Sequence, residues 1–153
     1  MISLDSNLMR DVLISELEIE AKKDKNIILI SNEQGAIALD SFRKNLPNQF
    51  INAGVSEQNI ISAAAGMASA GKKVFVYSIA TFITLRCLEQ IKLDVGVMNL
   101  PVNIIGVGAS FSYDVAGPSH HATEDISILR SINNLEIFSP SDNITTKNLL
   151  KLI

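Results

Sequence analysis

One carboxylate stands at the start of a long segment of small and apolar residues. Glu57 follows Ser56, which has the position and the hydroxyl of a helix N-cap, and the next charged residue is Lys72. Glutamate is common in the first turn of a helix, so its position alone indicates no function. The small side chains that follow would let a planar ligand or another backbone approach closely. A glutamate buried there would be desolvated, so we expect a raised pKa and a shared proton.

Two adjacent histidines, His120 and His121, follow a Gly-Pro turn in the sequence GPSHHATED (117–125). Neighbouring side chains of an extended segment point in opposite directions, so at most one of them is expected to face a given site. The pattern is compatible with helix capping and surface packing, and equally with proton transfer or a substrate contact. Because the chain has only these two histidines and no third ligand at a suitable spacing, no metal site is predicted.

A third group of candidate residues lies in TFITLRCLEQIKLDV (81–95). Phe82 and Arg86 are one helical turn apart and are expected to share a helix face, although Phe82 alone would be a typical core residue. Cys87 has no activating base near it in the sequence and is predicted to lie in the core. The segment GVGASF (106–111) lacks the third glycine of a dinucleotide-binding turn, so a tight exit from a strand is predicted there.

These residues must be positioned by an alternation of helices and strands. Short apolar runs, typical of strands covered on both faces, occur at 26–31, 73–78, 102–108 and 135–139, with a short additional strand expected at 50–54. Helices are predicted at 6–23, 56–71, 81–97, 123–132 and 142–153. This order predicts an α/β fold, a three-layer α/β/α doubly wound and mainly parallel sheet in one domain. Ligands of such sheets bind beyond the carboxyl ends of the strands, where the candidate residues lie.

The composition limits the class of protein. A chain of 153 residues that is 47% hydrophobic and 19% charged suits one globular domain over residues 1–153. The net charge is −3 and the lysines are scattered, which excludes a basic surface for nucleic acid. A single cysteine and an N-terminus without the apolar core of a signal peptide predict a reducing, cytoplasmic setting. The last predicted helix has no terminal cap, so we expect the sequence to be cut from a longer chain.

Three stretches of the sequence together resemble a known family. They are FINAGVSEQNIISAAAGMASAGKKVFV, TFITLRCLEQIK and GPSHHATEDISILRSINNLEIFSPSD. In this order and spacing, over about residues 5–150, the chain resembles the pyrimidine-binding domain of transketolase-type enzymes that depend on thiamine diphosphate. It is most similar to the separate C-terminal subunits of split transketolases.

The resemblance implies a role for five residues. Glu57 matches the glutamate that hydrogen-bonds the aminopyrimidine ring of the cofactor, which favours the tautomer able to take the proton from the thiazolium carbon. Phe82 matches the aromatic residue that stacks on this ring. His120 matches a histidine near the thiazolium and the substrate oxygens, and Asn32 and Arg86 are expected among the residues that bind the cofactor.

The chain also departs from the family pattern. Asn32 stands where aspartate is usual, and Ile79 and Leu85 replace aromatic residues that line the pyrimidine pocket in ordinary transketolases. Gly108 and Ala116 occupy positions where a substrate-contacting histidine and aspartate are common. A standard role in pentose phosphate metabolism therefore does not follow from the resemblance.

The resemblance also implies a partner. Related enzymes bind Mg²⁺ and the cofactor's diphosphate through a GDG…N motif on another domain, and this sequence contains neither GD nor DG. An active enzyme is expected only with a diphosphate-binding N-terminal subunit, in a homo- or hetero-oligomer with a dimer-type contact, and with a substrate of the sugar-phosphate type. Two alternatives stay open: a part of a 2-oxo-acid dehydrogenase β-subunit or deoxyxylulose-phosphate synthase, and a non-catalytic assembly module.

Overall fold

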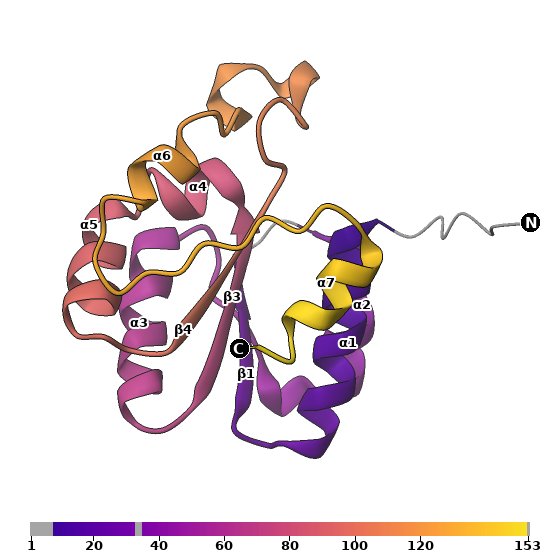
Figure 1. Cartoon of the computed structure of the whole chain (residues 1–153). Coiled ribbons are helices and arrows are strands. Elements are labelled where there is room, and N and C mark those ends of the chain that lie inside the picture. Colours follow the sequence, from indigo (N-terminus) through magenta and orange to yellow (C-terminus); the bar gives the residue numbers. More distant parts are fainter. Residues whose placement is uncertain (1–7, 33–34, 153) are drawn as a thin grey trace, which may run out of the picture.

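The computed structural model describes residues 8–32 and 35–152, which form a sheet with helices on both faces (Figure 1). The sheet has four parallel strands in the order β2-β1-β3-β4. Their bounds are β1 (Ile27–Ser31), β2 (Phe50–Asn52), β3 (Lys73–Ile79) and β4 (Val102–Val107). All strands point the same way, so their carboxyl ends meet at one edge, as the sequence predicts for a ligand site.

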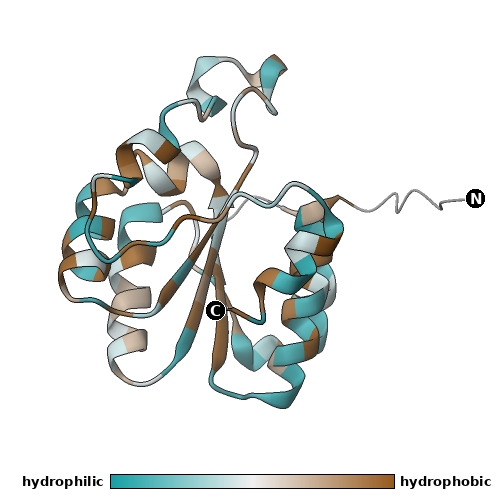
Figure 2. Cartoon of the chain, in the orientation of Figure 1, coloured by the Kyte–Doolittle hydropathy of each residue, from teal (hydrophilic) through white to brown (hydrophobic). Residues whose placement is uncertain are grey.

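Each face of the sheet carries its own hydrophobic core. Along β1, Ile27 and Leu29 belong to one core, and Ile28 and Ile30 to the other, because successive side chains of a strand point to opposite faces. Figure 2 shows the hydrophobic colour along most of β1 and along the middle of β3. Strands of this kind need a cover on both sides, which the helices provide.

The helices divide into two layers. One layer holds α1 (Met9–Lys23), α2 (Asp40–Asn45) and α7 (Asn143–Leu149). The other holds α3 (Glu57–Ser69), α4 (Ala80–Thr84), α5 (Leu88–Gln90), the π-helix η3 (Ile91–Val97) and α6 (Asp125–Leu129). The predicted three-layer α/β/α fold with a parallel sheet is thus confirmed.

Two predictions about individual elements are wrong. The apolar run at 135–139 forms no strand, and Phe138 is 45% exposed. After α6 this segment crosses to the opposite helix layer to reach α7, so it does not run alongside β4 (Figure 1). The helix predicted at 81–97 is interrupted at 85–87, resumes as α5 and then continues as the π-helix η3.

Other differences concern short elements. The helix α2 was not predicted, since it is six residues long and buries only Phe42. The helices expected at 123–132 and 142–153 are shorter, at 125–129 and 143–149. Thr123, the residue in GPSHHATED expected to cap the helix that begins near Asp125, does not cap α6, whose N-cap is Glu124. Within the described ranges, no helix has the length and apolar character needed to cross a membrane.

Candidate functional site

Four candidate residues lie at the carboxyl edge of the sheet, each on a different connection. Asn32 directly follows β1, Glu57 begins α3 after β2, and Phe82 lies in α4 after β3. His120 ends the short 3₁₀ turn η5 (Pro118–His120) in the segment after β4. Side chains from separate parts of the sequence are therefore gathered at one place by the parallel sheet.

Glu57 is buried and both of its carboxylate oxygens are occupied. The side chain is 3% exposed. Its Oε1 accepts a hydrogen bond from Asn32 Nδ2 at 2.7 Å, and its Oε2 pairs with an Arg86 guanidinium nitrogen at 2.9 Å. A buried carboxylate with such partners is held in one orientation, so its position is set by three connections of the fold.

The sequence led us to expect a raised pKa for Glu57, and this expectation is wrong. Burial alone raises the pKa of this carboxyl. Its backbone amide at the helix start, the Asn32 amide and the Arg86 guanidinium together outweigh burial and leave the pKa below the ordinary value. Glu57 is therefore a buried, ionised carboxylate at neutral pH.

Ser56 does not cap α3 through its side chain, contrary to expectation. It occupies the N-cap position, but its hydroxyl donates to the Ala53 carbonyl oxygen at 2.8 Å and accepts no amide of the first turn. The start of α3 consequently relies on Glu57, whose negative charge in the first turn is favourable to the helix dipole.

Phe82 and Arg86 share a face, as predicted. The guanidinium carbon of Arg86 lies 4.4 Å from the centre of the Phe82 ring, a cation–π distance. The Phe82 ring is only partly buried, so it is not a core residue. Arg86 thus links the carboxylate of Glu57 to the aromatic ring of Phe82.

The two histidines meet different partners. The His120 ring lies 5.0 Å from the Phe82 ring in an edge-to-face arrangement, and its Nδ1 is 3.0 Å from the Ser119 hydroxyl. The His121 ring packs against Phe111, with 4.9 Å between ring centres. Only His120 joins the group around Glu57, which agrees with the expectation that one histidine at most faces the site.

Cys87 is fully buried, as predicted for a core residue. Its Sγ lies 3.4 Å from the Phe82 carbonyl oxygen, and burial raises the pKa of the thiol to about 12. A thiol that stays protonated at neutral pH is a poor nucleophile. Cys87 supports the Phe82 backbone and takes no chemical role.

Asn32 carries an unsatisfied acceptor. The residue is 5% exposed, and its Oδ1 has no hydrogen-bond partner among the described residues, while its Nδ2 is bound to Glu57. Buried polar atoms are almost always paired, so an orphan of this kind is a place where a ligand's N–H could bind.

Sequence reasoning missed Tyr113. Its ring lies 6.1 Å from the His120 ring and against the Cα of Gly108, where a Cβ would meet the tyrosine Cε2 at 2.0 Å. The available signal was an aromatic residue five positions after Gly108, the glycine that directly follows β4. Ala116, another position where the resemblance implies a departure from the family pattern, is exposed.

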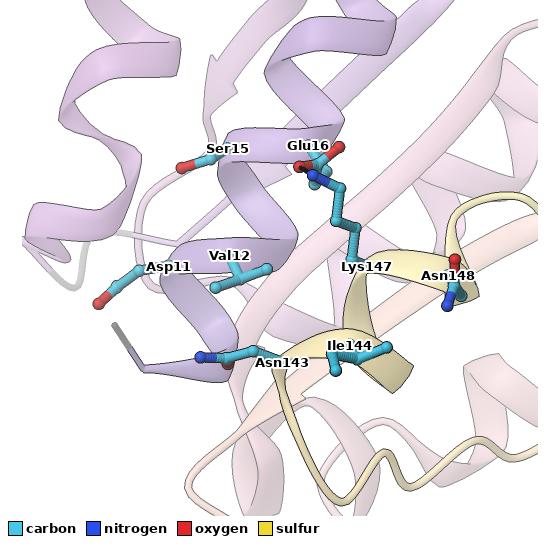
Figure 3. A pocket seen from close by; sticks show the side chains of 8 residues that line it. All are labelled: Asp11, Val12, Ser15, Glu16, Asn143, Ile144, Lys147 and Asn148. Carbon is cyan, nitrogen blue, oxygen red and sulfur yellow. Dashed lines mark ion pairs between the residues drawn. The ribbon is translucent and has the colours of Figure 1, made fainter. Parts of the chain in front are cut away.

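A separate groove lies between α1 and α7 (Figure 3). Its volume is about 440 Å³, and Lys147 and Glu16 form an ion pair of 2.7 Å on its wall. Both helices cover the face of the sheet opposite α3. The groove therefore does not contain the residues gathered around Glu57. Within 8–32 and 35–152, no cluster of three or more potential metal ligands occurs.

Comparison with known proteins identifies the family. Residues 6–153 match the family described as "Transketolase, pyrimidine binding domain". One of the subunits of the apulose-4-phosphate transketolase of Phocaeicola vulgatus is 38% identical over 134 residues, which cover 87% of this chain and 43% of the relative. The 1-deoxy-D-xylulose-5-phosphate synthase of Desulfotalea psychrophila is 39% identical over 130 residues, 84% of this chain and 20% of the relative.

A solved structure agrees with this result. A split-gene transketolase, described as an inactive beta4 tetramer, superimposes with a TM-score of 0.82 at 28% identity, covering 94% of this chain and 46% of that one. The chain thus spans less than half the length of these relatives. By its sequence match and its fold, the chain belongs to the transketolase pyrimidine-binding domain family.

Proposed function

We propose that this chain forms the pyrimidine-binding half of a thiamine-diphosphate-dependent transketolase, which transfers a two-carbon ketol unit between sugar phosphates or related sugars. The observation that carries the proposal is the buried carboxylate of Glu57, joined through Arg86 to the ring of Phe82 at the carboxyl edge of the sheet. A carboxylate and a flat aromatic face are the two groups that an aminopyrimidine ring requires.

Each residue has a distinct task in this proposal. Glu57 meets a ring nitrogen, and Phe82 offers its face to the ring. The free Oδ1 of Asn32 accepts an N–H, and Arg86 holds the Glu57 carboxylate. His120 stands beside Phe82, where it contacts substrate oxygens. Thiamine diphosphate, when bound, supplies the carbon nucleophile that attacks a ketose carbonyl.

The protonation state of the Glu57 carboxyl is critical for this proposal. A glutamate can donate a hydrogen bond to a ring nitrogen only when it is protonated, whereas its own backbone amide, the Asn32 amide and the Arg86 guanidinium lower the pKa of Glu57. Weakening of either side-chain contact would therefore favour proton uptake. Arg86 is 46% exposed and can move into solvent, while Asn32 is buried, so the Arg86 contact is the one expected to change.

A partner must complete the enzyme. Residues 1–153 contain no GD or DG pair of the kind that begins the diphosphate motif, and the relative from Phocaeicola vulgatus is itself one subunit of a transketolase. We infer that Mg²⁺ and the diphosphate bind to an N-terminal transketolase subunit. The setting of the assembled enzyme is cytoplasmic in this proposal.

The test is reconstitution with a diphosphate-binding transketolase subunit. Calorimetry should show uptake of thiamine diphosphate with Mg²⁺ by the mixture, and ketol transfer should follow. Mixtures that contain Glu57→Ala in place of the native chain should lose the transfer and keep the assembly. Absence of cofactor uptake by the native mixture would support a non-catalytic assembly module instead.

A second candidate is favoured by the similarity to a deoxyxylulose-phosphate synthase at 39% identity. The pyrimidine site would be used in the same way, but the donor would be a 2-oxo acid. Decarboxylation of pyruvate by the assembled complex, without ketol transfer, would decide for this reaction or for a 2-oxo-acid dehydrogenase β-subunit. Release of CO₂ separates the two classes, because ketol transfer produces none.

A further inference from the structure

The segment 109–121, here called the arm, projects beyond the carboxyl end of β4 (Figure 1). Its two ends are tied together by an antiparallel bridge, in which Ser110 and Ala122 exchange backbone hydrogen bonds of 2.9 Å each. Within the arm the backbone makes only short 3₁₀ turns, η4 (Asp114–Ala116) and η5. The arm therefore depends on side-chain contacts for its position relative to the sheet.

One such contact joins the arm to the end of β4. The ring of Tyr113 lies so close to Gly108 that a Cβ at this position would be 2.0 Å from Cε2 and 2.5 Å from Cδ2. The backbone of Gly108 also has a φ of +78°, a conformation that residues other than glycine rarely adopt. Only glycine leaves room for this ring, so Gly108 and Tyr113 form a matched pair.

From Gly108 the contacts lead to the proposed site. The Tyr113 ring meets the His120 ring edge-to-face with 6.1 Å between centres, and the His120 ring meets Phe82 in the same way at 5.0 Å. We infer that Tyr113, seated on Gly108, is a positioning residue that fixes the imidazole of His120 over Phe82. This inference rests on the proposed function of the site. It also gives Gly108 a role, which is to leave room for the Tyr113 ring.

The physical reason is the limited support of His120. Its Nδ1 is near the Ser119 hydroxyl, which lies on the same short turn and moves with it. The ring contacts that reach His120 from outside its own turn come from Phe82 and Tyr113. Without Tyr113, the arm loses its contact with the end of β4, and His120 gains freedom. A misplacement of about 1 Å can lower a rate by about 100-fold.

The first experiment reads the His120 ring directly, in the full chain without cofactor. Ring protons of His120 are measured by NMR and assigned with a His121→Gln variant. Tyr113→Ala removes the neighbouring ring current and should shift these resonances, and Gly108→Ala should produce the same shift by expelling the ring. Tyr113→Phe should leave them close to native. Unchanged resonances in Tyr113→Ala would overturn the inference.

Gly71→Ala is the matched control for backbone strain. Gly71 has φ +87° and nothing within 4 Å of an added Cβ, and it follows the end of α3 opposite to Glu57. This variant should lose stability as Gly108→Ala does, but it should leave the His120 resonances in place. If Gly108→Ala does not fold, the comparison of Tyr113→Ala with Tyr113→Phe decides alone.

The second experiment uses the assembled enzyme. Tyr113→Ala and Gly108→Ala should each lower kcat/KM for the sugar substrate by about tenfold, without changing the affinity for thiamine diphosphate. Their combination should cost no more than either alone, because both remove one contact. Additive losses, or a loss that Tyr113→Phe does not rescue, would contradict the inference. Absence of cofactor uptake by the native assembly would instead refute the proposed function, and the NMR result would be unaffected.

Discussion

Glu57 and His120 lie in the same site, but different kinds of structure hold them. Glu57 begins a helix that packs on the sheet, is 3% exposed, and is bound by two side chains from the ends of other elements. His120 lies in a projecting arm and is held by aromatic contacts. The contacts around Glu57 are therefore buried and polar, whereas those around His120 are aromatic and lie on a mostly exposed arm.

This difference has a functional consequence. In the proposed function, Glu57 must contact the aminopyrimidine ring in one orientation. A carboxylate that is already held in place favours this, because its reorganisation during the reaction would lower the rate. Under the proposed function, differences in sugar recognition would be expected in the arm, because exposed loops tolerate change in sequence better than buried helix ends. Of the five departures that the resemblance implies, Gly108 and Ala116 fall in or beside the arm, whereas Asn32, Ile79 and Leu85 fall at or just after the ends of β1, β3 and α4.

The largest expected effect is from Glu57. Glu57→Gln in the assembled enzyme should lower kcat by about 10²- to 10⁴-fold, since the amide cannot exchange a proton with the ring. Steady-state kinetics of ketol transfer measure the loss, and circular dichroism checks the fold. Activity within about threefold of native would mean that the Glu57 carboxylate is not needed for ketol transfer.

Asn32→Asp should change the pH dependence of stability. Two carboxylates in hydrogen-bond contact share a proton, so one of their pKa values rises above the unfolded value. The stability linked to that proton is present at low pH and is lost as the pH rises through the raised pKa. In urea unfolding, the free energy of unfolding of the variant should fall further below that of the native protein at pH 7 than at pH 4. A constant difference would show that the two side chains are not coupled.

Arg86→Gln should have a smaller effect on the pH dependence of stability, with the same sign. The pKa of Glu57 is lowered in the folded chain, so its contribution to stability is present above the ordinary value of 4.5 and disappears as the pH falls through the folded value. Removal of the half-exposed Arg86 should cost about 1 kcal/mol at pH 7 and less at acid pH. The pKa of Glu57, followed by ¹³C NMR, should rise toward its ordinary value; a lower pKa would reverse the assigned role of the arginine.

The smallest effect on activity is expected from Cys87. Cys87→Ala removes a buried sulfur beneath Phe82, and the stability should fall by about 1 kcal/mol while kcat is retained. The native thiol should resist alkylation at pH 8, because burial raises its pKa to about 12. Rapid alkylation of the folded protein, followed by mass spectrometry, would show that the core beside the site opens.

The same contrast explains what could be predicted from the sequence. The strands of the sheet and the placing of Asn32, Glu57 and Phe82 at its carboxyl edge follow from local apolar runs. The sign of the pKa shift of Glu57 did not follow, because its partners Asn32 and Arg86 are 25 and 29 positions away. The seat of Tyr113 on Gly108 depends on one backbone angle, which no sequence pattern specifies.

The prediction of a strand at 135–139 was wrong for another reason. Its apolar residues have the composition of a buried strand, but a strand also needs a neighbouring edge that runs in its direction. The chain must cross here to the other helix layer, and Asn134 turns it with a φ of +60°. The local pattern identified the apolar run at 135–139, but the path of the chain toward α7 prevents this run from forming a strand.

The central claim is tested most directly by a crystal structure of this chain assembled with a diphosphate-binding transketolase subunit, Mg²⁺ and thiamine diphosphate. We expect a carboxylate oxygen of Glu57 within hydrogen-bond distance of a pyrimidine nitrogen, with the ring stacked on Phe82 and the guanidinium of Arg86 displaced. A cofactor ring bound elsewhere, with Glu57 still paired to both Asn32 and Arg86, would contradict the account.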